Sequence, residues 1–174
     1  LGADNVKINE PMKNHTTFKI GGCADYFLTP ENENGLTGLL KTLNKSGMPF
    51  FVLGNGSNVL FGDKGFRGAV ICLYKKVDKV SVSGTVVSAQ CGALLSKVAK
   101  EALGARLSGF EFASGIPGTV GGGVFMNAGA YGFELKDVIG SVRCVDKTGK
   151  AMVLSADECK FGYRKSIFSE KELI

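Results

Sequence analysis

The chain has 174 residues, of which 44% are hydrophobic and 21% charged, a composition typical of a soluble globular protein with one domain or two small lobes. Its net charge of +5 is spread along the sequence, with no basic stripe interleaved with aromatic residues. This pattern favours an anionic small molecule over nucleic acid as the partner. His15 is the only histidine, which we take as evidence against a Ser-His-Asp triad and which excludes a multi-histidine metal site.

Five irregularly spaced cysteines predict buried, reduced thiols in a cytosolic protein and no disulfide framework, zinc site or other metal site. The uncharged stretch 113–133 is long enough to cross a bilayer, but Gly and Pro interrupt it and only about half of it is apolar, so we expect no membrane span. No signal peptide opens the sequence, which begins at Leu1 and not at Met. We therefore expect that residues precede it.

Taken in chain order, the hydrophobic periodicity predicts an α+β protein. Helices are expected at 32–46, ended by Gly47 and Pro49, and at 94–103, capped by Gly104, with a capping box at 155–158 starting a further helical turn. The expected strands are 24–28, 50–53, 69–73, 77–83, 85–89, 141–146 and 151–154. We expect a largely parallel lobe over residues 1–73 and an antiparallel lobe over 74–174.

The strand at 50–53 runs directly into a turn rich in glycine and asparagine. Oriented backbone N–H groups in such a turn form a concavity for anions. The turn is not a Rossmann fingerprint, because Val59 stands where the third glycine belongs, and the chain contains no P-loop motif. The residues of this first candidate nest are Gly54, Asn55, Gly56, Ser57 and Asn58.

The stretch 108–134 carries eight glycines and only two charges, Glu111 and Glu134. Two interpretations stay open here: a run of loops and bulges, or a ligand held largely by backbone N–H groups. Two separate nests favour one large anionic ligand, such as a dinucleotide, over a single phosphate.

Four motifs, in this order, resemble the N-terminal part of the UDP-N-acetylenolpyruvoylglucosamine reductase family. They are NHTTFKIGGCADYF from Asn14, VLGNGSNVLF from Val52, SGIPGTVGGGVFMNAGAYG from Ser114 and FGYRKSIF from Phe161. The resemblance covers nearly the whole chain. It implies the two-lobed α+β FAD-binding fold of the p-cresol methylhydroxylase / vanillyl-alcohol oxidase type, with flavin between the lobes.

The resemblance also implies a role for particular residues. The 54–58 loop would hold the FAD pyrophosphate, a second segment would line the other side of the dinucleotide, and a third would lie near the isoalloxazine ring. The second segment is Ser114, Gly115, Ile116, Pro117, Gly118, Thr119, Val120 and Gly121, and the third is Asn127, Ala128 and Gly129. FAD is expected to bind non-covalently, because His15, read as a solvent-facing or packing residue, lies outside the 54–58 loop.

The implied reaction is reduction of a UDP-sugar enolpyruvate by NADPH, in bacterial peptidoglycan precursor synthesis in the cytoplasm. Tyr163 and Arg164 match the family's substrate-side pair, with Arg164 the catalytic arginine. A guanidinium stays charged and grips a carboxylate through two parallel donors. From the residues alone, a surface arginine and a packing tyrosine remain open as alternatives.

The family continues beyond Ile174 into a further domain that supplies a proton donor and a catalytic glutamate, which have no counterpart here. The chain is therefore expected to be a fragment, or to have an unordered remainder, and to be inactive alone. An FAD oxidase of the same fold and a non-catalytic nucleotide-binding module are the alternative functions. The sequence leaves the oligomeric state open.

Overall fold

The computed structural model describes residues 1–171 and 173–174. Its N-terminal half is built on a four-stranded sheet in the order β1-β2-β4-β3. The strands are β1 (Val6–Pro11), β2 (Cys23–Leu28), β3 (Phe50–Leu53) and β4 (Phe66–Cys72). β4 pairs in parallel with both β2 and β3, which confirms the predicted parallel character, whereas the edge strand β1 pairs antiparallel with β2.

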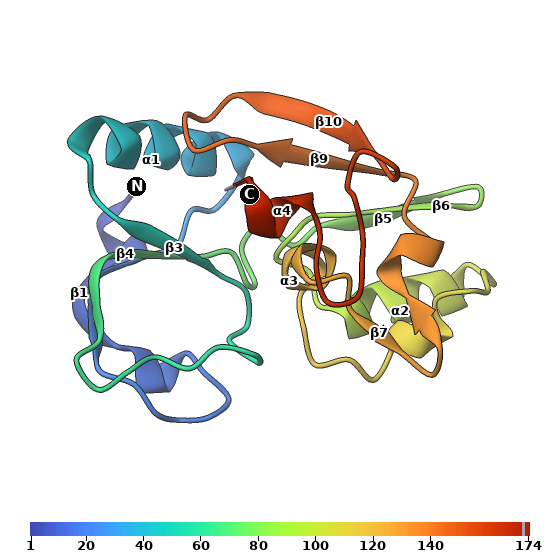
Figure 1. Cartoon of the computed structure of the whole chain (residues 1–174), viewed down its shortest axis with the longest axis horizontal. Coiled ribbons are helices and arrows are strands. Elements are labelled where there is room, and N and C mark those ends of the chain that lie inside the picture. The colour runs from blue at the N-terminus through green and yellow to red at the C-terminus, as the bar shows by residue number, and fades with distance from the viewer. Residues whose placement is uncertain (172) are drawn as a thin grey trace.

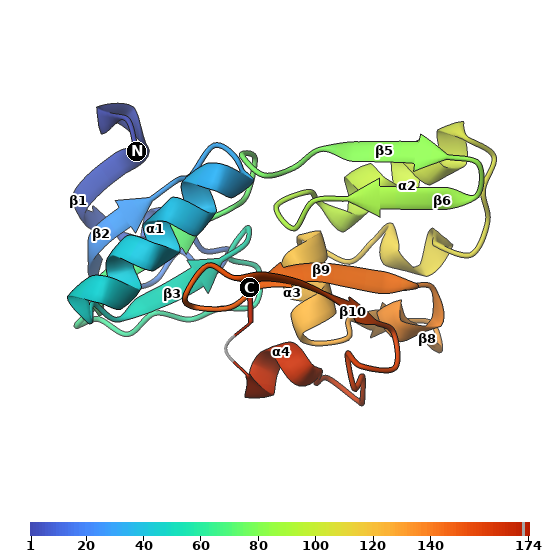
Figure 2. The same ribbon diagram turned by 90° about the horizontal axis from the view of Figure 1, so that it is seen from above.

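The helix α1 (Glu33–Ser46) covers one face of this sheet (Figures 1 and 2). It begins at Asn32, whose side chain accepts a hydrogen bond from the Gly35 N–H, and ends at Gly47 in the left-handed region with φ 68°. Because side chains alternate along β4, Ile71 packs with α1 while Val70 packs in a second cluster on the opposite face. The sheet is therefore buried on both faces.

The C-terminal half consists of short helices and two-stranded antiparallel sheets. The predicted hairpins are confirmed as β5–β6 and β9–β10, and the capping box forms, with the Glu158 N–H donating to Ser155 Oγ. The remaining elements are β5 (Val80–Ser83), β6 (Val86–Ala89), α2 (Leu95–Gly104), α3 (Val120–Phe125), β7 (Gly129–Ala130), β8 (Phe133–Glu134), β9 (Ser141–Val145), β10 (Ala151–Ser155), α4 (Ile167–Glu170), and the 3₁₀ turns η1 (Ala3–Asn5), η2 (Met12–Asn14), η3 (Glu111–Ala113) and η4 (Leu135–Asp137).

Two details of α2 differ from the sequence prediction. The helix includes Gly104 and ends at Ala105, and the left-handed residue that follows is Arg106, with φ 58°. Leu103, expected on the apolar face, is 76% exposed. Gly104 is thus not the cap, because the chain makes its left-handed turn two residues later.

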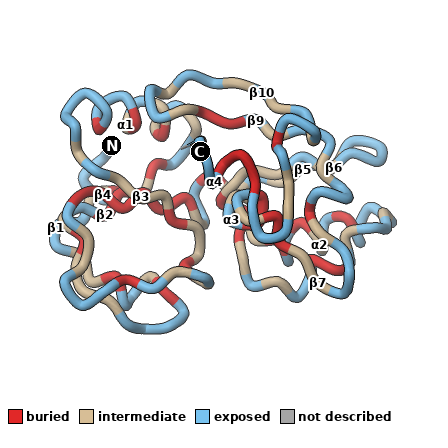
Figure 3. Tube along the Cα trace, viewed as in Figure 1, coloured by how far each residue is buried: buried red, intermediate tan, exposed pale blue. Residues whose placement is uncertain are grey.

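The β9–β10 hairpin extends from the C-terminal half toward α1 (Figure 1). Arg143 forms an ion pair with Glu33 of α1, and Val145 packs in the hydrophobic cluster under α1. Buried residues follow the central strands and the surroundings of α3 (Figure 3). Since contacts cross between the halves, the division into lobes 1–73 and 74–174 stays a prediction. Within the described residues, no helix is both long and apolar enough to traverse a bilayer.

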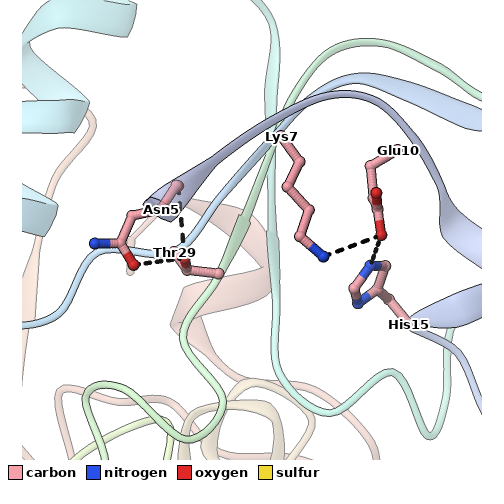
Figure 4. A network of polar contacts seen from close by, with 5 residues as sticks. All are labelled: Asn5, Lys7, Glu10, His15 and Thr29. Atoms are coloured by element: carbon pink, nitrogen blue, oxygen red, sulfur yellow. Dashed lines mark hydrogen bonds and ion pairs between the residues drawn. The ribbon is translucent and has the colours of Figure 1, made fainter. Parts of the chain in front are cut away.

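A polar network fixes the chain between β1 and β2 (Figure 4). Glu10 Oε1 lies 2.7 Å from His15 Nε2 and 3.4 Å from Lys7 Nζ. The His15 ring also stacks on Phe27, with 3.9 Å between ring centroids. His15 is therefore a packing residue, one of the two roles expected for it.

The Glu10 carboxylate should give the protein an acid-sensitive contribution to stability. Burial raises the pKa of Glu10, but the hydrogen bond with His15 and the charge of Lys7 outweigh it, so the pKa lies below its ordinary value of 4.5. A pKa lowered by folding contributes stability above the unfolded pKa, and this stability is lost as the pH falls through the folded pKa. The loss in free energy of unfolding caused by Glu10→Gln should therefore shrink as the pH falls below 4.5.

Denaturant unfolding of wild type and Glu10→Gln at several pH values measures this difference. Glu101→Gln, an exposed change on α2, is the control and should show no such trend. If Glu10→Gln lowers the free energy of unfolding by the same amount at every pH, the pair with His15 does not set the pKa of this carboxylate.

Candidate functional site

The loop 54–58, the first candidate nest, follows β3 and rests on the segment 15–17. Gly56 adopts φ 68°, and a Cβ added to it would lie 2.0 Å from the carbonyl oxygen of His15. The Thr17 N–H donates to the Gly56 carbonyl at 3.0 Å. Only glycine fits here, because both the conformation and the contact forbid a side chain.

The backbone N–H groups of residues 55–58 are open, in the sense that they have no hydrogen-bond acceptor among the described residues; Gly56 itself is a buried residue. No described residue accepts a hydrogen bond from the N–H groups of Asn55, Gly56, Ser57 or Asn58. Ser57 Oγ donates to Asn55 Oδ1 at 3.2 Å, which helps to fix the turn. Unpaired amides held in a tight turn at the end of a strand are an arrangement that can bind an anion. The assignment of this loop to the pyrophosphate stays a prediction.

This loop lies directly against the second glycine-rich segment. A Cβ added to Gly54 would lie 2.4 Å from Thr119 Oγ1, and Asn55 Nδ2 donates to the Pro117 carbonyl at 3.4 Å across 62 residues of sequence. Asn58 Nδ2 lies 3.4 Å from Met126 Sδ. The fold therefore brings together the two motifs that the sequence singles out.

The amides of the second segment are mostly used within the chain. The N–H groups of Val120 and Gly121 donate to the carbonyls of Ala93 and Cys91, each at 2.8 Å, and the Gly118 N–H donates to Ile116. The expectation of a second nest of open amides is wrong for these three residues. The assignment of 114–121 to cofactor binding itself stays a prediction.

Close packing explains several glycines of this segment. A Cβ on Gly121 would lie 2.9 Å from Cys91 Cβ, and one on Gly123 would lie 2.8 Å from Leu135 Cδ1. Glycine is therefore required at these two positions for α3 to pack against its neighbours. This packing accounts for a helix in a run of three glycines, which the sequence pattern does not predict. In contrast, Gly115 has nothing within 4 Å of an added Cβ, and the nearest atom for Gly118 is Leu95 Cδ1 at 3.8 Å.

The cysteines offer no reactive thiolate near this segment. Burial raises the pKa of Cys91 to about 11, so its thiol is protonated at neutral pH. Cys72, Cys144 and Cys159 are buried as predicted, but Cys23 and Cys91 are only half-buried. All five are free thiols.

Tyr163 and Arg164 form the tip of a tight turn. The Gly162 N–H donates to Lys165 O at 3.0 Å, and the Lys165 N–H donates back to Gly162 O at 3.2 Å. Arg164 Nη2 donates to the Gly129 carbonyl at 3.2 Å, and its guanidinium carbon lies 5.3 Å from the centroid of the exposed Tyr163 ring. The turn therefore places a cation beside β7.

A cavity of about 430 Å³ lies between this turn and the segment 129–137. Its wall includes Glu134 and Lys136, whose carboxylate and ammonium groups are 2.7 Å apart. The hydrogen bond between them lowers the pKa of Glu134 and raises that of Lys136. Neither residue is among the predicted site residues, although Glu134 stands out in the sequence as the end of the long uncharged stretch.

The residues predicted beside the flavin ring take different positions. Asn127 is fully buried, and its side chain contacts other parts of the chain; Ala128 is 7% exposed within the C-terminal core. Gly129 pairs with Glu134 in the β7–β8 sheet. The backbone is left-handed at Asn127 and at two residues that line the cavity, Tyr131 and Arg164, with φ of 44°, 56° and 55°.

The sequence and structure of this chain are similar to those of known FAD-binding proteins. Residues 24–155 match the model of the FAD binding domain family. A UDP-N-acetylenolpyruvoylglucosamine reductase of Caldanaerobacter subterraneus is 51% identical over 100% of this chain and 57% of its own length. The protein of the same name from Clostridioides difficile is 46% identical over the same shares. The chain thus spans little more than half the length of these relatives.

Solved structures agree with the sequence matches. The UDP-N-acetylenolpyruvylglucosamine reductase of Thermus caldophilus superposes with a TM-score of 0.76 at 36% identity, covering 92% of this chain and 55% of that one. p-Cresol methylhydroxylase, at 20% identity, superposes with a TM-score of 0.61 over 88% of this chain and 33% of that one, which confirms the predicted α+β fold type. The matched range 24–155 covers most of the chain and includes both the loop 54–58 and the segment 114–121. The chain therefore belongs to the FAD binding domain family.

Proposed function

We propose that the protein containing this chain reduces UDP-N-acetylglucosamine enolpyruvate to UDP-N-acetylmuramate with NADPH, using FAD. This reaction would supply peptidoglycan precursors in the bacterial cytoplasm and so support cell-wall biogenesis, cell shape and cell division. The observation that carries the proposal is the contact between the open-amide loop 54–58 and the segment 117–119, in a chain about half identical to reductases of this name.

The site is chemically suited to FAD. The open amides of Asn55–Asn58 would hold the pyrophosphate, with 114–121 lining the other side of the dinucleotide and 127–129 lying near the ring. Binding would be non-covalent, because the loop has no histidine and the His15 side chain is held by Glu10 and Phe27.

When bound, FAD would carry hydride from NADPH to the β-carbon of the enolpyruvyl ether, and a proton delivered to the α-carbon would complete the reduction. Arg164 would bind the substrate carboxylate and stabilise the negative charge that develops next to it, since a guanidinium remains protonated at neutral pH. Its anchor on the Gly129 carbonyl orients one nitrogen and leaves other N–H donors for the carboxylate. Tyr163, beside it at the tip of the turn, would contact the substrate.

The full-length protein should be yellow, and acid precipitation should leave free flavin in the supernatant. Under anaerobic conditions NADPH should bleach the flavin, and the enolpyruvyl substrate should restore its colour. Rapid recovery with oxygen, and none with the substrate, would favour an FAD oxidase. Absence of bound flavin would favour a nucleotide-binding module, and colour retained in the pellet would contradict non-covalent binding.

Gly118→Val should weaken FAD binding while leaving the fold intact. The position has room for a Cβ in the protein, so a branched side chain would compete mainly with the ligand. Overpacking typically costs 1–3 kcal/mol, which predicts an increase in Kd of about ten- to a hundred-fold. Fluorescence titration of the apoprotein measures it.

Gly38→Val, in open space on α1, serves as the matched control and should bind FAD normally. Gly56→Val is a poorer probe, because its Cβ would collide with the His15 carbonyl and disturb the loop itself. Equal Kd values for Gly118→Val and wild type would mean that FAD does not lie against this glycine.

Arg164→Ala should retain FAD and its reduction by NADPH but slow re-oxidation by the enolpyruvyl substrate. Loss of one preorganised electrostatic partner typically slows a reaction by about a hundred- to a thousand-fold, or roughly 3 to 4 kcal/mol. Arg164→Lys should recover part of the rate, since it keeps the charge without the planar fork. Stopped-flow absorbance separates the two half-reactions.

Arg106→Ala is the matched control, because Arg106 is also exposed and left-handed, with φ 58°, but lies outside the cavity. It should leave both half-reactions unchanged. The assignment of Arg164 would be wrong if Arg164→Ala lost FAD or kept the wild-type rate of re-oxidation.

A further inference from the structure

Both polar atoms of the Asn127 side-chain amide form hydrogen bonds within the protein. Its Nδ2 donates to the Gly162 carbonyl and to Glu134 Oε2, each at 3.0 Å, and its Oδ1 accepts from the Lys136 N–H at 3.0 Å. The residue is 0% exposed. An asparagine amide has two N–H donors, so neither is left for a ligand.

The three contacts join the two walls of the 430 Å³ cavity. Gly162 begins the turn that carries Tyr163 and Arg164, while Glu134 and Lys136 belong to the opposite wall. On the other side of the turn, the buried Ser166 donates through Oγ to the Phe125 carbonyl at 2.6 Å. Both ends of the turn are therefore tied to the C-terminal end of α3.

We propose that Asn127 is a positioning residue for Arg164, and that its side chain does not bind FAD. The backbone of 127–129 can still lie near the flavin, but the amide serves to fix the distance between the arginine turn and the Glu134–Lys136 wall. The expected effect on the rate of re-oxidation rests on the reductase function proposed above, whereas the expected effect on hydrogen exchange does not.

The physical reason is that Arg164 has little else to hold it. Its side chain is exposed, and among the described residues it forms one hydrogen bond, to Gly129 O. A guanidinium stabilises a developing charge only if it is already in place, and misplacement by about 1 Å can slow a reaction about a hundred-fold. A fully satisfied buried amide is the kind of contact that fixes one geometry.

Asn127→Gly in the full-length protein tests the proposal, because glycine tolerates the φ of 44° and removes only the side chain. Hydrogen exchange of the 162–165 amides should become faster, since the turn loses its anchor at Gly162. FAD affinity and flavin reduction by NADPH should stay within about threefold of wild type, while re-oxidation by the enolpyruvyl substrate should slow by up to about a hundred-fold.

The double variant Asn127→Gly/Arg164→Ala should re-oxidise no more slowly than Arg164→Ala alone, because a residue acting through Arg164 adds nothing once Arg164 is gone. The matched control is Asn5→Gly. Asn5 is also a buried asparagine whose side chain contacts three residues, Thr29, Glu31 and Lys76, but it lies at the end of η1, just before β1 (Figure 4). Its loss should leave re-oxidation unchanged.

The proposal is wrong if the exchange of 162–165 is unchanged, if FAD affinity falls together with the rate, if the single-variant losses multiply in the double variant, or if Asn5→Gly slows re-oxidation equally. Failure of the reductase function looks different. Wild type would then show no substrate-dependent re-oxidation, while the exchange experiment would still report whether Asn127 holds the turn.

Discussion

The close approach of Gly54 to Thr119 is the constraint on which the site depends. A Cβ added to Gly54 would lie 2.4 Å from Thr119 Oγ1, so these two segments of the chain can touch only because residue 54 has no side chain. Thr119 is 2% exposed, and its hydroxyl also accepts the Gly122 N–H at the start of α3. The Thr119 side chain therefore caps a helix and also lies at the contact between the segments 54–58 and 117–119.

Hydrogen bonds around α3 connect this contact between Gly54 and Thr119 to the rest of the site. α3 is held to the 91–93 segment by the amides of Val120 and Gly121, and its C-terminal end carries Asn127 and accepts the Ser166 hydroxyl. The arginine turn is thus connected to the open-amide loop through a single short helix. The loop proposed to hold the pyrophosphate and the turn that carries Arg164 therefore share one short helix as their support.

Much of this architecture could be predicted from the sequence. α1, the parallel strands and the two hairpins have strong periodicity and clear end signals, such as Asn32 and Gly47 for α1. The edge strand β1 could not be predicted, because Lys7, Ile8 and Asn9 are all exposed and show no alternation. α3 could not be predicted either, because three successive glycines disfavour a helix. Only the structure shows that close packing requires glycine there.

The candidate site was predictable to a similar extent. Glycine spacing and family resemblance indicated the loop 54–58 and the turn at 163–164, but spacing cannot show that Gly54 touches Thr119. Nor can it show which amides are open: those of 55–58 are, whereas those of 120 and 121 are not. The structural role of Asn127 depends on partners up to 35 residues away, which no local pattern reveals.

The left-handed backbone at Tyr131 and Arg164 places this cavity in a trade-off between stability and activity. Each non-glycine residue held in that conformation costs roughly 1–2 kcal/mol, and both of these residues line the cavity. Glycine at either position would relieve the cost, but it would remove an aromatic ring or a guanidinium. This part of the chain is therefore less stable than its backbone allows, and the strain is retained together with the side chains that form the cavity wall.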